Sequence, residues 1–214
     1  MLKVLEDLEL FAPENNFDYI VGLDEVGRGC IAGPVTVAAC LVSVKELPLV
    51  DVQGVRDSKK ISPKKRNLIK ELLEQNPYLE FELQNIEAPV IDEINILQAT
   101  FLGMHKACDA LLKRLAIEPD KVALLVDGHL LPPFCKSKNF AKVLALTKGD
   151  SRSFVIAAAS IMAKESRDLL MKKHSQNFPQ YMWQNNAGYP TAMHKQAVRE
   201  SGLTKLHRRS FKST

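Results

Sequence analysis

The pattern of apolar and polar positions predicts strands that alternate with helices. Two continuous apolar runs, residues 19–23 (YIVGL) and 35–44 (VTVAACLVSV), have the length and β-branched content of buried strands. The glycines and the proline between these runs predict a hairpin-type connection. Residues 78–87 (YLEFELQNIE) alternate apolar and polar side chains, as a half-buried strand does.

Helical periodicity follows in four segments. Ser62 and Pro63 are a typical helix start, and the helix after them is expected to carry Leu68, Ile69, Leu72 and Leu73 on one face. Residues 89–116 predict a helix that is broken or bent near Asn95, residues 153–173 a long helix, and residues 191–200 a shorter one.

Two more short apolar strands are expected at residues 121–128 (KVALLVDG) and 141–150 (AKVLALTKGD). Strands followed by mixed strands and helices indicate an α/β fold with a mixed sheet flanked by helices. We expect residues 1–214 to form a single domain, with residues 178–214 as a basic, helical C-terminal extension that contributes to substrate binding.

The composition is that of a soluble globular protein, with 46% hydrophobic and 25% charged residues. The chain has no apolar run of the ~18 residues that a membrane helix needs, so no membrane association is expected. Its acidic N-terminus lacks the apolar core of a signal peptide. The four cysteines form no CxxC pair, which fits reduced thiols and a cytoplasmic location.

Charge is unevenly distributed along the chain. Residues 194–214 carry a net charge of +5, so the remaining residues together carry −1 of the total of +4. A basic tail on a nearly neutral body is typical of a protein with an anionic partner, most often nucleic acid. A solvated tail that aids solubility explains the charge equally well.

Acidic residues stand beside glycines at the ends of three predicted strands: Asp24 with Glu25, Asp127, and Asp150. Ligands of open α/β sheets collect at strand ends, so we expect these acids to converge. Grouped carboxylates repel one another unless a cation lies among them, and oxygen ligands suit Mg²⁺. For any one acid alone, capping of a backbone N–H is the simpler interpretation; the threefold repetition favours a metal site.

Adjacent strand residues point to opposite faces, so Asp24 and Glu25 can serve one site only if the chain bends, and the glycine turn at residues 27–29 offers that bend. Motifs for zinc sites, serine hydrolases and P-loops are absent from the sequence. In the long helix a polar sector (Ser153, Ser160, Lys164 and Arg167) either approaches phosphates or faces solvent, with Lys164 paired to Asp168.

Seven segments resemble, in order, those of the ribonuclease HII family: GLDEVGRG, DSKK, DEINILQAT, LLVDG, KGDSRSFVIAAASIMAKESRD, GYPT with a following histidine, and HRRSF. They span nearly the whole chain. The resemblance implies a ribonuclease H-like fold and an endonuclease that hydrolyses the RNA strand of RNA/DNA hybrids and cuts 5′ of ribonucleotides in duplex DNA. It further implies two-metal-ion catalysis with Mg²⁺ or Mn²⁺, products with 5′-phosphate and 3′-hydroxyl ends, and a role in ribonucleotide removal and RNA primer processing.

By position in these motifs, the resemblance assigns metal binding and catalysis to four acids: Asp24, Glu25, Asp127 and Asp150. It assigns contacts with the nucleotide that bears the 2′-hydroxyl to Gly27, Arg28 and Gly29, and stacking on the sugar at the RNA–DNA junction to Tyr189. Lys59 and the basic residues of HRRSF are further candidates for backbone contacts. We expect a monomer, and a contact with a sliding clamp is left open by the sequence.

Two positions depart from the family pattern. His129 follows the second acidic strand where asparagine is common, and Cys30 follows the glycine turn where proline is frequent. We hypothesise that Cys30, close to the acids, makes activity sensitive to thiol modification.

Three other interpretations have a sequence feature against them. A non-catalytic nucleic-acid-binding protein with this core would be expected to lose one or more of the four acids. A Holliday-junction resolvase gives no reason for the GRG and GYP segments. A ribonuclease HIII usually has an additional N-terminal domain, whereas about twenty residues precede the first strand here.

Overall fold

The computed structural model describes residues 7, 10, 16–55, 58 and 61–211. Within this part of the chain five strands form one mixed sheet in the order β3-β2-β1-β4-β5. The strands are β1 (Tyr19–Val26), β2 (Val35–Ser43), β3 (Leu79–Ile86), β4 (Val122–Asp127) and β5 (Lys142–Leu146). β1 pairs antiparallel with β2 and parallel with β4, and β4 pairs parallel with β5, so the predicted mixed sheet is confirmed.

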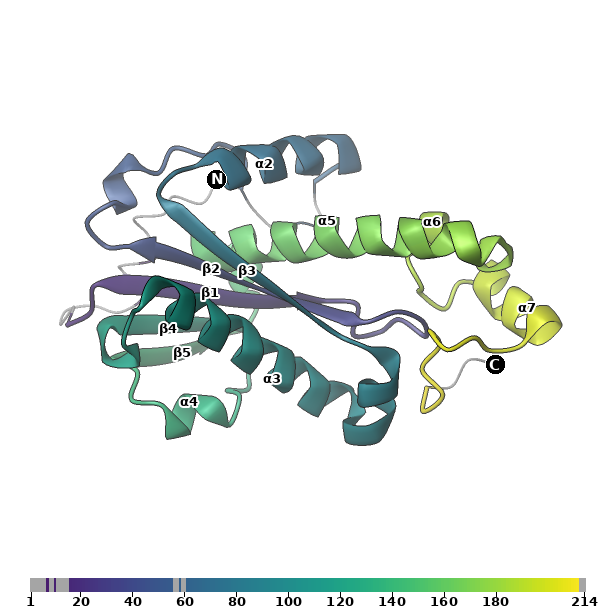
Figure 1. Ribbon diagram of the computed structural model, residues 1–214. Helices are drawn as coiled ribbons and strands as arrows, with labels where there is room; N and C mark the ends of the chain where they lie inside the picture. The colour runs from purple at the N-terminus through teal and green to yellow at the C-terminus, as the bar shows by residue number, and fades with distance from the viewer. Residues whose placement is uncertain (1–6, 8–9, 11–15, 56–57, 59–60, 212–214) are drawn as a thin grey trace.

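Helices cover both faces of this sheet (Figure 1). They are α2 (Pro63–Gln75), α3 (Ala88–Leu115), α4 (Phe134–Ser137), α5 (Phe154–Asn177), α6 (Trp183–Asn186) and α7 (Ala192–Ser201). Across the described residues, none of these helices is long and apolar enough to cross a lipid bilayer.

Alternating residues of β1 divide the core into two layers. Ile20 packs in the cluster that includes α5, whereas Val21 and Leu23 pack in the cluster that includes α3. At Gly22 a β-carbon would lie 2.5 Å from the backbone carbon of Val155 in α5. Backbone therefore packs on backbone here, and the alanine-rich start of α5 is fully buried as its composition predicts.

The sequence pattern locates most of these elements, predicts the bend in α3 and errs in two places. Asn95 has φ 67° inside α3, which confirms the predicted bend. β5 ends at Leu146 and does not reach Asp150. In α2 only Ile69 and Leu73 of the expected apolar face are buried; Leu68 and Leu72 are exposed, because α2 packs with a narrow stripe beside α5.

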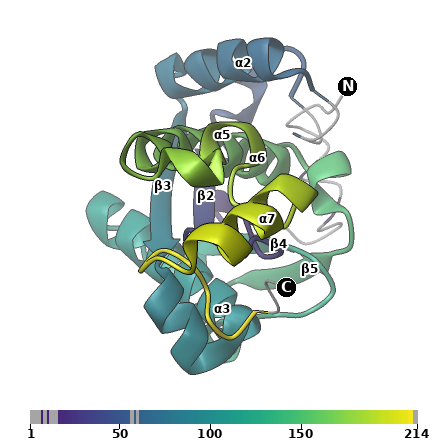
Figure 2. The same cartoon turned by 90° about the vertical axis from the view of Figure 1, so that its right-hand side faces the viewer.

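The C-terminal helices pack against the distal half of α5, at the end of the sheet where β1 ends (Figures 1 and 2). A small core forms there around Tyr181 and Trp183, with Ile31 and Ala32 from the connection between β1 and β2. The C-terminal region therefore shares a hydrophobic core with the loop that follows Asp24 and Glu25.

Candidate active site

Asp24 lies next to Asp127 in the sheet. The last paired residues of β1 and β4 are Leu23 and Val126, so each acid follows directly on neighbouring parallel strands. Asp24 is only 4% exposed; its Oδ1 accepts a hydrogen bond from the Glu25 backbone N–H at 2.7 Å, and it also bonds the Ser160 hydroxyl. Burial raises the pKa of Asp24 well above its ordinary value, and the charges of Glu25 and Asp127 raise it further.

Glu25 lies on the opposite face of the strand. It lines a small hollow of about 50 Å³ with Thr100 and Met104 of α3 and with His129, and its carboxylate lies 3.5 Å from the Arg28 guanidinium. The glycine turn at residues 27–29 does not supply the expected bend at the two acids, because β1 stays paired with β2 through Val26 and the turn begins only after it. Asp24 therefore faces α5 and Glu25 faces α3. The expectation that only a bend could bring them to one site is nevertheless wrong, because Asp127 on the neighbouring strand raises the pKa of Asp24 and also lines the hollow of Glu25.

Asp127 and Asp150 are joined through one backbone contact. Asp127 ends β4, and its Oδ1 accepts a hydrogen bond from the Gly149 N–H at 2.6 Å. Asp150 is the next residue, in a short 3₁₀ turn (Gly149–Ser151) entered through Lys148 at φ 57°. This turn, and not a strand end as the sequence predicts, sets Asp150 beside Asp127.

The acids thus place carboxylate oxygens, which can act as metal ligands, at one edge of the sheet. Among the described residues there is, however, no group of three or more His, Cys, Asp or Glu side chains arranged to hold a metal ion. The pKa of buried Asp24 is still raised by its burial and then by the negative charges of Glu25 and Asp127, as expected for carboxylates that crowd one another.

Two serines extend the site: Ser160, from the polar sector that the sequence predicts in α5, and Ser58, which the sequence pattern does not single out. Ser160 of α5 contacts Asp24 and lies 2.9 Å, hydroxyl to hydroxyl, from Ser58 of the DSKK segment. The polar sector of α5 hence faces the acids at this point and not solvent. Lys59, in the same DSKK segment, lies outside the described residues.

Gly27 and Gly29 have different surroundings. Gly27 is buried with φ 92°, and a β-carbon there would lie 2.3 Å from Nε of Arg167. Gly29 is exposed, and a β-carbon there would meet nothing within 4 Å. Only Gly29 offers an open backbone surface; Gly27 is required by packing inside the protein.

Arg167 is fully buried, so neither interpretation of its place in the polar sector of α5 is correct. Its guanidinium donates hydrogen bonds to the carbonyl oxygens of Pro34 at 2.9 Å, Ala187 at 2.7 Å and Ala32 at 3.1 Å. Lys164, by contrast, pairs with Asp168 at 2.6 Å, as the simpler interpretation predicts.

The GYP segment docks on the glycine turn although the two are about 160 residues apart. The Gly188 carbonyl accepts a hydrogen bond from the Ile31 N–H at 2.9 Å, and a β-carbon on Gly188 would lie 2.4 Å from the Ala32 oxygen. Tyr189 is half-buried and lies beside Cys30. The thiol of Cys30 is buried and its pKa is raised by that burial, which argues against the hypothesised sensitivity to thiol reagents.

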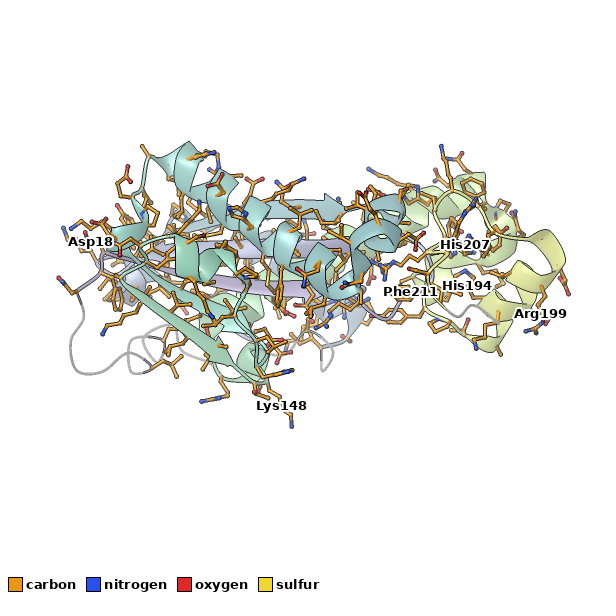
Figure 3. The ribbon with its side chains drawn as sticks, turned by 90° about the horizontal axis from the view of Figure 1, so that it is seen from below. Asp18, Lys148, His194, Arg199, His207 and Phe211 are labelled. Carbon is orange, nitrogen blue, oxygen red and sulfur yellow. The ribbon has the colours of Figure 1, made fainter. Side chains whose placement is uncertain are left out.

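Two buried histidines, His194 and His207, lie together in the C-terminal region (Figure 3), and His194 holds the GYP segment through the Tyr189 carbonyl. His194 Nδ1 donates to the Tyr189 carbonyl at 2.9 Å, and its Nε2 accepts from the Trp183 indole at 3.0 Å. His207 Nδ1 accepts from the Thr204 N–H at 2.9 Å, so its Nε2 donates across 3.3 Å to His194. The Trp183 indole and His207 Nε2 share the single lone pair of His194 Nε2, an arrangement that requires a neutral His194 ring, and burial lowers the pKa of His207 to about 4.

Known proteins resemble the chain over most of its length. The family model for ribonuclease HII matches residues 21–214. A ribonuclease HII from Rickettsia felis is 44% identical over 197 residues, covering 91% of this chain and 92% of the relative.

Solved structures agree with the fold. The ribonuclease H2 from Pyrococcus horikoshii superimposes with a TM-score of 0.72 at 25% identity, covering 91% of this chain and 94% of that one. Bst-RNase HIII in complex with Mn²⁺ gives a TM-score of 0.73 at 20% identity, covering 100% of this chain and 71% of that one. Taken with the family model and the relative, these matches establish that the chain belongs to the ribonuclease HII family and is an enzyme, a type 2 ribonuclease H.

Proposed function

We propose that this enzyme hydrolyses the RNA strand of RNA/DNA hybrids and cuts 5′ of ribonucleotides embedded in duplex DNA, leaving 5′-phosphate and 3′-hydroxyl ends. Ribonucleotide removal and RNA primer processing are the roles that follow. The observation that carries the proposal is the buried carboxyl group of Asp24, coupled to Glu25 and Asp127, at the sheet edge from which the exposed Gly29 turn extends.

Asp24, Glu25, Asp127 and Asp150 are the residues that would hold two divalent ions, Mg²⁺ or Mn²⁺. The donor chemistry fits, because all four groups are carboxylates. The pKa of Asp24 is raised first by burial and then by the charges of Glu25 and Asp127, and a bound cation would relieve that repulsion. When bound, such ions supply activation of the attacking water and stabilisation of the leaving 3′-oxygen.

The chain itself orients two of the four carboxylates before any ligand arrives. Asp24 is held by the Glu25 N–H and the Ser160 hydroxyl, and Asp127 by the Gly149 N–H. Groups fixed in this way need little reorganisation on binding, which is how preorganised polar sites lower a barrier. Ser160 and Gly149 are therefore positioning residues in this proposal.

Recognition of RNA is assigned to the exposed part of the turn. A 2′-hydroxyl distinguishes a ribonucleotide from a deoxyribonucleotide, and a backbone without a side chain can approach it closely. Gly29 satisfies this condition and Gly27 does not. Arg28, whose side chain is 48% exposed, can reach an adjacent phosphate, and Tyr189, on the segment docked against the turn, can stack on the neighbouring sugar.

Cleavage of a matched set of substrates tests this function. The set contains an RNA/DNA hybrid, duplex DNA with one ribonucleotide, the same duplex without it, and a four-way DNA junction, each with Mg²⁺ or Mn²⁺. We expect cutting of the first two only, 5′ of the single ribonucleotide. Binding without cutting would favour a non-catalytic protein, and cutting of the junction alone would favour a resolvase.

A further inference from the structure

Arg208 belongs to the basic HRRSF segment, yet its side chain is fully buried. Its Nε donates to the Gly33 carbonyl oxygen at 3.0 Å, and its Nη1 donates to the Arg28 carbonyl oxygen, also at 3.0 Å. The guanidinium packs over the ring of Phe211 at 5.1 Å. Arg208 therefore presents no charge to a nucleic-acid backbone, unlike its exposed neighbour Arg209.

Backbone contacts fix Arg208 in place from both sides. Its own N–H donates to the Ile31 carbonyl at 2.8 Å, and the Gly33 N–H donates to the Leu206 carbonyl at 2.8 Å. The carboxylate of Asp92, in α3, accepts hydrogen bonds from the N–H groups of Arg209 and Ser210 at 2.9 Å each. The C-terminal segment is thus attached both to the connection between β1 and β2 and to α3, and Figure 2 shows the chain passing from α7 to α3.

The hydrogen bond to the Arg28 carbonyl determines where the next N–H points. In a planar trans peptide, the C=O of one residue and the N–H of the next point in opposite directions. Because the Arg28 oxygen points inward to Arg208, the Gly29 N–H points outward, on the exposed side of the turn. Within the described residues that N–H makes no hydrogen bond.

A buried guanidinium is a costly way to hold a loop. Burial lowers the pKa of Arg208 to about 10, which leaves it charged at neutral pH, and its Nη2 has no partner among the described residues. The planar guanidinium group of an arginine can, however, donate to two carbonyl oxygens at once and so fix their relative orientation. The two carbonyls it holds belong to Arg28, in the glycine turn, and to Gly33, just before β2 begins.

We propose that Arg208 is a positioning residue that aims the Gly29 N–H outward, where it donates a hydrogen bond to the oxygen of a substrate 2′-hydroxyl. The role of the Gly29 N–H in recognising RNA rests on the proposed function, whereas the orientation of this N–H is a property of the protein alone. Arg208 acts through the peptide bond and contacts no substrate.

The test compares Arg208→Met and Arg208→Lys with Arg209→Met, the exposed neighbour. Three quantities are measured: kcat/KM on duplex DNA with one ribonucleotide, Kd for the all-DNA duplex at several salt concentrations, and the Gly29 amide resonance in ¹⁵N-glycine-labelled protein. For both Arg208 variants we expect kcat/KM to fall at least about tenfold, Kd to stay within about twofold, and the Gly29 resonance to shift. Lysine does not rescue, because an ammonium cannot span both carbonyls. Arg209→Met leaves the Gly29 resonance in place and reduces the salt slope by about one.

Two results would overturn the proposal. One is an unchanged Gly29 resonance in both Arg208 variants. The other is a loss of all-DNA binding in Arg208→Met that Arg208→Lys restores, which would make Arg208 a phosphate contact. If the wild type fails to cut any ribonucleotide substrate, the proposed function falls, and the Gly29 resonance alone decides the claim about Arg208. If Arg208→Met does not fold, Arg208→Lys carries the same comparison.

Discussion

A β-carbon on Gly27 would lie 2.3 Å from Nε of Arg167, so the arginine of α5 fills the space beside this glycine. Arg167 holds the same loop by hydrogen bonds to the carbonyl oxygens of Ala32 and Pro34. Arg167 of α5, the helix that also carries Ser160, therefore fixes the conformation of the GRG turn from the protein interior. Gly27 is needed for this packing, whereas Gly29 faces solvent.

Gly27→Ala and Gly29→Ala should separate stability from activity. At Gly27 the added methyl group meets Arg167 and a left-handed backbone, so we expect a loss of about 1–3 kcal/mol in the free energy of unfolding, measured with urea. At Gly29 nothing within 4 Å is displaced, so stability should change by less than about 0.5 kcal/mol. Gly29→Ala should nevertheless lower kcat/KM on a ribonucleotide-containing duplex at least about tenfold. Equal stability losses in the two variants would contradict this division.

Asp24→Asn should stabilise the metal-free protein. A carboxyl group whose pKa is raised by folding opposes folding once pH exceeds its unfolded value, and the full penalty is present above the folded value. We therefore expect a higher Tm for Asp24→Asn than for wild type in chelator at pH 7–8.

Mg²⁺ should then raise the Tm of wild type more than that of Asp24→Asn, because binding to the folded state stabilises it. A lower Tm for the variant in chelator would show that the ionised Asp24 carboxylate does not destabilise the folded protein. Equal responses to Mg²⁺ would remove Asp24 from the metal site.

The histidine pair predicts loss of stability in acid. The pKa of His207 is about 4 against an ordinary 6.5, so the unfolded state binds the proton more readily and stability falls as pH drops from about 7 to 4. The maximum effect is about 3 kcal/mol, measured as the urea unfolding free energy across this range. His207→Leu should flatten that dependence whatever its effect at pH 7. An unchanged slope in His207→Leu would assign the acid sensitivity to other groups.

Thiol reagents should leave the folded enzyme unmodified. All four cysteines are buried, and burial raises the pKa of Cys30. With DTNB at pH 8 we expect fewer than one thiol to react before unfolding and all four to react in denaturant. Rapid labelling of Cys30 in folded protein, with parallel loss of activity, would restore the hypothesis that the sequence raises.

The sequence predicts features of the fold that depend on contacts between residues close together in the chain, and misses those that depend on residues far apart. The bend at Asn95 is local, since its side chain accepts hydrogen bonds from Leu97 and Gln98, and the pattern shows it. The buried strands are equally visible because their apolar runs are continuous. The exposure of Leu68 and Leu72 is not visible, because it depends on how α2 meets α5.

The candidate site divides in the same way. Acids beside glycines can be read along the chain, and so can the motifs that carry the family resemblance. The burial of Arg167 and Arg208 cannot, because a charged residue is normally exposed and their partners are carbonyl oxygens up to 180 residues away. A separation of 102 residues likewise hides the contact of Ser58 with Ser160.

Cleavage of duplex DNA that contains one ribonucleotide, compared between wild type and Asp24→Asn, tests the central claim most directly. With Mg²⁺ or Mn²⁺ the wild type should cut 5′ of the ribonucleotide and leave the matched all-DNA duplex intact. Asp24→Asn should fold, bind the duplex and cut at least about 10³-fold more slowly. Equal cutting by both proteins, or equal cutting of the two duplexes by the wild type, would contradict the account.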